Sequence, residues 1–146
     1  NNFLYAFDNY AESYAPVVYS QLAGDKIVDR SSDKALHDEL ERDLAYIEFE
    51  ARTEPAKWNS NGFLAAWVAS KIRLGQGDDA WSVMLENFNH NVAVPADGCE
   101  SEDPAEPCQV DPAAAVPFPK ALANFLQETG YGPLPMTAVT SVSSVH

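Results

Sequence analysis

The sequence predicts an all-α fold, an antiparallel helical bundle or a stack of helical hairpins with about five helices and little or no sheet. Two observations predict it: apolar residues recur at three- and four-residue steps over most of the chain, and prolines gather in one stretch, 91–119. The chain has 146 residues, 46% of them apolar, which is enough for one buried core. We therefore expect a single helical domain over 1–136 and a flexible or docking tail over 137–146.

The first helix is expected over about residues 2–22. Its buried stripe would consist of apolar residues at helical spacing: Phe3, Phe7, Tyr10, Tyr14, Val17, Val18 and Leu22. Gly24 would end this helix, and Pro16 would kink it or split it in two.

The second helix is opened by the "SSD" sequence at 31–33, where Ser32 can cap the first turn and Asp33 suits the positive end of the helix dipole. Its buried stripe is expected to be Leu36, Leu40, Leu44 and Ile47. The charged run "HDELERD" between these positions is interpreted as a solvated face.

The third and fourth helices are expected to form a tight αα-hairpin. "FLAAWVASKIRL" follows a cap at Ser60 or Asn61 and has an apolar face wide enough for burial on more than one side. Gly75 would stop this helix, and the next would start at Asp78 and bury Trp81, Met84, Leu85 and Phe88. A fifth helix, "PKALANFLQETG", would bury Leu122, Phe125 and Leu126 and stop at Gly130.

The long loop between the fourth and fifth helices contains Cys99 and Cys108, nine positions apart in polar, proline-containing sequence. This spacing is typical of a disulfide formed in an oxidising compartment, and two unpaired thiols are the alternative. We expect the disulfide, which would clip the loop and place the protein in a secreted, periplasmic or organelle-lumenal compartment.

The same loop is acidic over residues 97–111. Its carboxylates are Asp97, Glu100, Glu102, Asp103, Glu106 and Asp111. They offer the oxygen ligands that calcium prefers, but their spacing lacks the register of an EF-hand. The favoured interpretation is therefore a solvated loop without a cofactor, with calcium as the alternative.

The chemistry-bearing residues form no recognisable catalytic or transition-metal motif. His37, His90 and His146 lie far apart in the sequence, so no metal site is predicted, and only His90 lies near the acidic loop. The tryptophans can stack on sugar rings, although helical spacing makes Trp67 and Trp81 better candidates for the core. Whether the protein is an enzyme is left undecided.

One run of motifs resembles a known family. "YSQLAGDKI", "LERDL", "WNSNG", "RLGQGDDAW", "QVD" and "ALANFLQETG" follow one another over about residues 16–136, an order similar to the C-terminal helical part of the (α/α)₆-barrel glycoside hydrolases of the α-L-fucosidase type. The resemblance implies that Asp111, in "QVD", is the general base that activates water in an inverting mechanism. Trp58 would then be a substrate-binding residue.

Charge restricts the partners of the chain. The formal net charge is -13, and no cluster of basic residues offers a surface for nucleic acid. No apolar run reaches the roughly 20 residues that span a bilayer. We predict a soluble, non-catalytic accessory subunit that docks on a larger assembly through exposed aromatic residues and its tail, onto a partner with a basic surface. The alternative function is a fragment or subunit of a secreted glycoside hydrolase.

Overall fold

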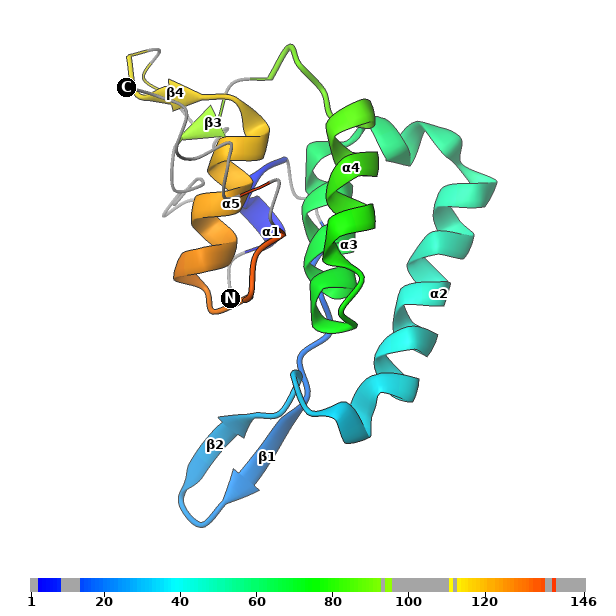
Figure 1. The fold of residues 1–146 in the computed structure, drawn as a ribbon, viewed down its shortest axis with the longest axis vertical. Helices are drawn as coiled ribbons and strands as arrows, with labels where there is room; N and C mark the ends of the chain where they lie inside the picture. Colours follow the sequence, from blue (N-terminus) through cyan, green and yellow to red (C-terminus); the bar gives the residue numbers. More distant parts are fainter. Residues whose placement is uncertain are drawn as a thin grey trace.

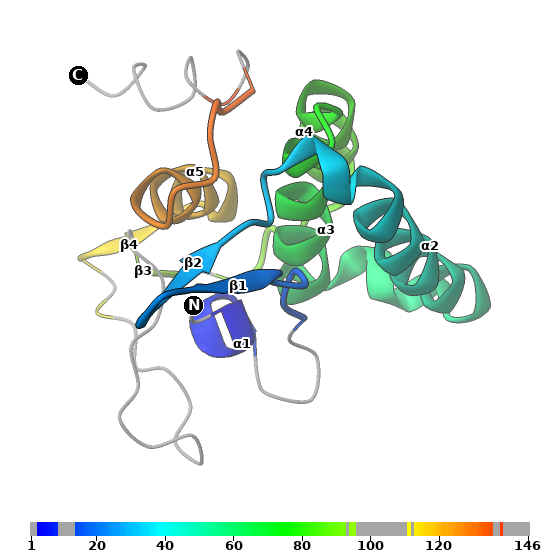
Figure 2. The same cartoon turned by 90° about the horizontal axis from the view of Figure 1, so that it is seen from below.

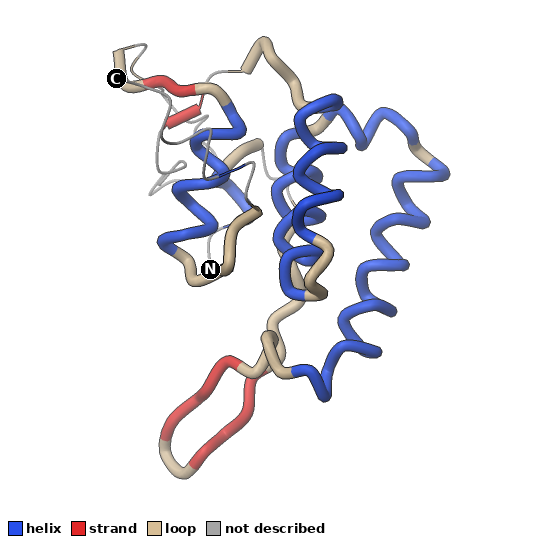
Figure 3. Tube along the Cα trace, in the orientation of Figure 1, coloured by secondary structure: helices blue, strands red, loops and turns tan. Residues whose placement is uncertain are grey.

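The computed structural model describes residues 3–8, 14–92, 94–95, 111, 113–135 and 138. Its helices are α1 (Phe3–Ala6), α2 (His37–Thr53), α3 (Asn61–Arg73), α4 (Gly77–Asn87) and α5 (Phe118–Glu128). Its strands are β1 (Ser20–Ala23), β2 (Lys26–Asp29), β3 (Val94–Pro95) and β4 (Ala115–Val116). The 3₁₀ turns η1 (Lys34–Leu36) and η2 (Pro55–Asn59) precede α2 and α3 (Figure 3).

Helix α3 lies at the centre of the described structure, with α2 on one side and α5 on the other (Figure 2). Every side chain from Phe63 to Ala69 is buried, so the helix packs on several neighbours at once, as its wide apolar face predicts. Its first turn is capped by Ser60, whose hydroxyl oxygen accepts a hydrogen bond from the amide of Phe63 at 3.2 Å.

The predicted αα-hairpin is confirmed in α3 and α4, which lie side by side (Figure 1). Gly75 ends α3 in the left-handed region, at φ +74°. Trp81 and Met84 of α4 are fully buried, as predicted, whereas Leu85 is 38% exposed. The amide of Asn89, just after α4, donates to the buried side-chain oxygen of Asn61 at 2.9 Å, so the two ends of the hairpin are fastened together.

Helix α2 packs on α3, and its Leu40 and Leu44 are buried as predicted, whereas Leu36 and Ile47 are half-buried. Beside them, the carboxylate of Glu48 accepts from the indole nitrogen of Trp67 at 2.9 Å and from the Lys71 ammonium at 3.1 Å. The first cap differs from the prediction, because Asp33 and not Ser32 accepts a hydrogen bond from the start of η1.

Helix α5 and the segment that contains α1 complete the core through edge-to-face contacts between aromatic rings. The ring of Phe3 meets Phe125 at a centroid distance of 4.8 Å, and that of Phe7 meets Phe118 at 5.3 Å, both nearly perpendicular. Gly130 follows α5 at φ +82°, as expected of its role as a helix stop. Ala138 is the described residue of the predicted tail and is buried.

The helix predicted over 2–22 is wrong. Helix α1 ends at Ala6, and residues 20–29 form an antiparallel β-hairpin in which Leu22 pairs with Ile27. Pro16 lacks the amide that a helix needs, and the β-branched and aromatic residues at 17–19 favour extended backbone. Gly24 then makes the two-residue turn at φ +66°.

The all-α fold class is therefore also wrong. Alongside the helices, the described residues contain two small antiparallel sheets, β1–β2 and β3–β4, and the second lies inside the stretch predicted to be loop. Four of the five predicted helices are formed as α2 to α5, and the first is reduced to the short helix α1. Cys99, Cys108 and most of the acidic loop lie outside the described residues, so the disulfide and the calcium alternative stay untested predictions.

Candidate interaction surfaces

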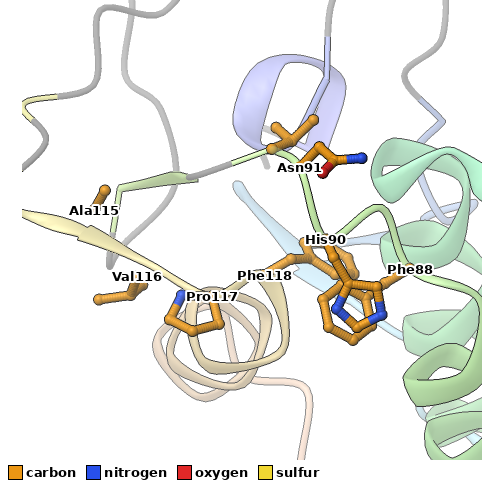
Figure 4. Close-up of a pocket in the computed structure, with 8 residues that line it drawn as sticks. Phe88, His90, Asn91, Ala115, Val116, Pro117 and Phe118 are labelled. Atoms are coloured by element: carbon orange, nitrogen blue, oxygen red, sulfur yellow. The ribbon is translucent and has the colours of Figure 1, made fainter.

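A groove of about 390 Å³ lies where α4 ends and α5 begins, beside β3–β4 (Figure 4). It is lined by Phe88, His90, Asn91, Val92, Ala115, Val116, Pro117 and Phe118. The imidazole of His90 is tilted against the ring of Phe88, with centroids 3.8 Å apart. No carboxylate lines the described part of this groove, so His90 has no acidic partner there. The lining favours an apolar ligand over acid–base chemistry.

Asp111, the predicted general base, is exposed on the turn that leads into β4. One of its carboxylate oxygens accepts a hydrogen bond from the amide of Ala113 at 2.9 Å, and its carbonyl accepts from Ala114 at 2.9 Å. In this position the side chain stabilises a turn, as an aspartate commonly does. No other predicted site residue lies beside it among the residues described.

Trp58, the predicted substrate-binding residue, lies in η2 and is half-buried. Its ring meets the rings of Phe63 and Trp67 edge-on, at centroid distances of 5.1 Å and 5.0 Å. Tyr14 extends the same cluster by packing on Phe63. The indole therefore adds to the aromatic core between η2 and α3.

Polar groups border this aromatic cluster. The ammonium of Lys57 donates to the hydroxyl of Tyr14, which in turn donates to Glu50 at 3.3 Å. The hydrogen bond to Tyr14, followed by the interactions with Glu54, raises the pKa of Lys57. A lysine held in its charged form is a structural tether between η2 and the chain that precedes the hairpin.

The histidines are dispersed. His37 is half-buried at the start of α2, His90 lies in the groove, and His146 is outside the described residues. Within the residues described, no three His, Cys, Asp or Glu side chains lie close enough to hold a metal ion. Nor does any helix there have the length and apolar character needed to cross a membrane.

The β1–β2 hairpin projects from the helical body (Figure 1). All eight of its strand residues are exposed, and the opposed side chains of Leu22 and Ile27 are 71% and 78% exposed. Isolated apolar side chains on a surface are ordinary, but these two face each other near the end of a projecting hairpin. The signal for it in the sequence is the Gly-Asp pair between "QLA" and "KIV".

The base of the hairpin is fastened to two helices. The hydroxyl of Tyr19 donates to Asp43 of α2 at 2.5 Å, a bond that raises the pKa of Tyr19. On α3, the guanidinium of Arg73 donates to the carbonyl of Val17 at 2.7 Å and packs over the ring of Tyr131. Hydrogen bonds from Ser31 lower the pKa of Asp29 at the end of β2. These contacts therefore fix the base of the β1–β2 hairpin to the helical core.

The fold and these surfaces define a class: a small domain with a helical core, built by α2 to α5, and a projecting apolar hairpin. The chain belongs to the family of the sll0997 C-terminal domain, whose model matches residues 38–130. That match begins in α2 and runs past α5, so it covers most of the helical core and leaves the hairpin outside.

Two relatives extend the comparison. The "Uncharacterized protein y4bJ" of Sinorhizobium fredii (strain NBRC 101917 / NGR234) is 40% identical over 131 residues, 90% of this chain and 21% of the relative. The "Probable thylakoid lumen protein sll0997" of Synechocystis sp. (strain ATCC 27184 / PCC 6803 / Kazusa) is 33% identical over 138 residues, 90% of this chain and 39% of the relative. The chain thus spans well under half of each relative. No solved structure matches it.

These findings overturn the resemblance to α-L-fucosidase-type hydrolases, because the family is a different one. The motif "RLGQGDDAW" has a structural origin: Gly75 adopts a positive φ, and a Cβ on Gly77 would lie 2.8 Å from Ile72. A tight αα-hairpin needs such residues whatever the protein does. The roles assigned to Asp111 and Trp58 came from the resemblance and lose that support.

Proposed function

We propose that this chain is a non-catalytic docking unit of a larger assembly and that it binds a protein partner through the β1–β2 hairpin. The observation that carries the proposal is the exposed cross-strand pair Leu22 and Ile27 at the projecting end of a fastened arm. Burial of two such side chains against a partner is worth about 1.5–3 kcal/mol each.

The anchoring of the arm favours binding. A two-stranded hairpin is marginal on its own in water, and ordering it at the moment of association would cost free energy. Here the contacts of Tyr19 with Asp43 and of Arg73 with Val17 already hold its base. Most of the ordering cost is therefore met within the free domain.

The partner is expected to present an apolar cleft with a basic rim. The cleft would take Leu22 and Ile27, and the rim would complement a chain of formal net charge -13. Opposite charge at the edge of an interface chiefly raises the association rate, an effect that salt screens.

The proposed compartment is lumenal or otherwise oxidising. A relative that is 33% identical over 90% of this chain is named a probable thylakoid lumen protein, which supports this placement. Fractionation of the source cells, with an antibody to the chain, tests it. Recovery of the protein with cytosolic markers would contradict the lumenal placement and leave the docking role untouched.

The docking role is tested with the double variant Leu22→Ser/Ile27→Ser. Tagged wild type and variant are expressed in the source cells, the proteins recovered with each are quantified, and the best candidate partner is purified and rebound. We expect one stoichiometric partner, and a Kd at least about 100-fold higher for the variant, because two apolar contacts are lost.

The matched control is Val83→Ser/Leu85→Ser on α4, where the two side chains are 37% and 38% exposed. It removes two apolar side chains from another face, although these are less exposed than Leu22 and Ile27, and it should bind like the wild type. Equal binding by the hairpin variant, or a wild-type protein that stays a lone monomer in its own cells, would rule out docking through the hairpin.

A further inference from the structure

The outward face of α2 carries a stripe of exposed side chains at heptad spacing, on the side of the helix that faces away from α3. The α2 stripe consists of Asp38, Arg42, Ala45, Phe49 and Arg52, all exposed. Steps of four, three, four and three residues place them along one line of a helix. Phe49 is 57% exposed, and the guanidinium of Arg52 lies 5.9 Å from the centre of its ring.

The order of residues along the α2 stripe is self-complementary. If a second α2 runs antiparallel about a two-fold axis at Ala45, then Asp38 of one copy lies opposite Arg52 of the other. In the same register Phe49 of one copy lies one residue from the position opposite Arg42 of the other, within reach of its long side chain, and the two copies of Ala45 meet at the axis. Each contact occurs twice, as a two-fold interface requires.

Each layer of this register has favourable chemistry. Asp38 with Arg52 makes an ion pair, and Arg42 over the exposed ring of Phe49 makes a cation–π contact. Ala45 has a small side chain, which lets the two helix axes approach closely. The antiparallel arrangement also brings opposite ends of the two helix dipoles together.

We propose that α2 is the interface through which two copies of this chain pair, in the antiparallel register centred on Ala45. The occupant of this surface is a second copy because the α2 stripe is complementary to itself when the second helix runs in the opposite direction. The acidic residue and the aromatic ring of one copy then meet the arginines of the other. Tyr46, 65% exposed and next to Ala45, adds apolar contact at the flank. This pairing uses a surface separate from the β1–β2 hairpin and does not depend on the proposed docking function.

The dimer is expected to be weak because its interface is small, and weakest at low salt because the two copies repel each other. α2 has 17 residues and is about 25 Å long, so one pair of such helices buries an area at or below about 1,200 Å², the range of transient complexes. Two copies of net charge -13 also repel each other over long range. At about 0.3 M salt that repulsion is screened within several ångströms, while the apolar contacts persist.

The test is sedimentation equilibrium of the whole chain at about 0.3 M NaCl, over protein concentrations from about 1 µM to 500 µM. We expect wild type to shift from monomer to dimer across this range. Asp38→Arg and Arg52→Asp should each weaken the dimer by about tenfold, because each places like charges opposite one another. Mixed in equal amounts, these two variants should form a heterodimer as stable as wild type, since both ion pairs reappear, one in its original sense and one with the charges exchanged.

The mixture separates the proposed register from misfolding and from non-specific adhesion. Variants that had lost their fold would not recover on mixing, and adhesion through Phe49 alone would ignore the charges. Leu22→Ser/Ile27→Ser serves as the control and should dimerise like wild type. A monomer at every concentration, or single variants that dimerise as well as their mixture, would overturn the proposal and leave docking through the hairpin untouched.

Discussion

At the residue scale, the polar side chain that most constrains the helical core is Asn61, which is 2% exposed. Its oxygen accepts from the amide of Asn89 at 2.9 Å, and its amide nitrogen approaches the carbonyl of Asn89 at 3.4 Å. One side chain thereby satisfies both backbone groups of a residue beyond α4. This fixes where the chain leaves the αα-hairpin and enters the groove that contains His90.

Asn61→Ala should lower the free energy of unfolding by about 1–3 kcal/mol, because the amide of the half-buried Asn89 would lose the partner that Asn61 supplies. Urea denaturation monitored by circular dichroism measures the loss. Asn59→Ala, at an exposed neighbouring position, is the control and should change stability by less than about 0.5 kcal/mol. Equal effects of the two substitutions would show that the pairing with Asn89 is not a stabilising one.

At the element scale, the turn between α3 and α4 depends on Gly75. Its φ of +74° lies in the left-handed region, and a Cβ added there would meet nothing within 4 Å. The cost of a side chain at this position is therefore purely conformational.

Gly75→Ala should destabilise the protein by about 1–2 kcal/mol, and Gly75→Asn by less, because asparagine tolerates the left-handed region better. Thermal unfolding of the two variants beside wild type measures the difference. If alanine proved as stable as asparagine, the turn would have to adopt another backbone conformation.

The helices and the β1–β2 hairpin differ in how well the sequence predicts them. The stripes of α2, α4 and α5 were predictable because each of these helices buries one apolar face, which leaves a 3.6-residue period in the sequence. Helix α3 was predictable from its wide apolar face, which is buried on several sides. The β1–β2 hairpin buries neither face, so no strand period records it. Its apolar residues instead join those of α1 in a run that imitates a helix, and only the Gly-Asp turn indicates otherwise.

The candidate surfaces were harder to predict than the helices. The sequence drew attention to Asp111 and the acidic loop, whereas the structure brings forward Leu22, Ile27 and Phe49. An exposed apolar residue cannot be told from a buried one by its type, so such sites become visible only once the core has been built.

At the scale of the whole molecule, the acidic surface should give folding and partner binding opposite responses to salt. With 22 acidic and 9 basic residues, the folded domain concentrates like charges, and screening relieves their repulsion. The free energy of unfolding, measured in urea, should therefore rise between about 20 mM and 300 mM NaCl.

Association with a basic partner should respond in the other direction over the same range. Screening removes the attraction that steers the partner to the β1–β2 hairpin, so the association rate in stopped-flow measurements should fall by about tenfold or more, with little change in the dissociation rate. A neutral osmolyte at equal osmolality controls for general solvent effects. An association rate that rose with salt would contradict attraction between this acidic chain and a basic partner. The apolar pair Leu22 and Ile27 would then bind without electrostatic guidance.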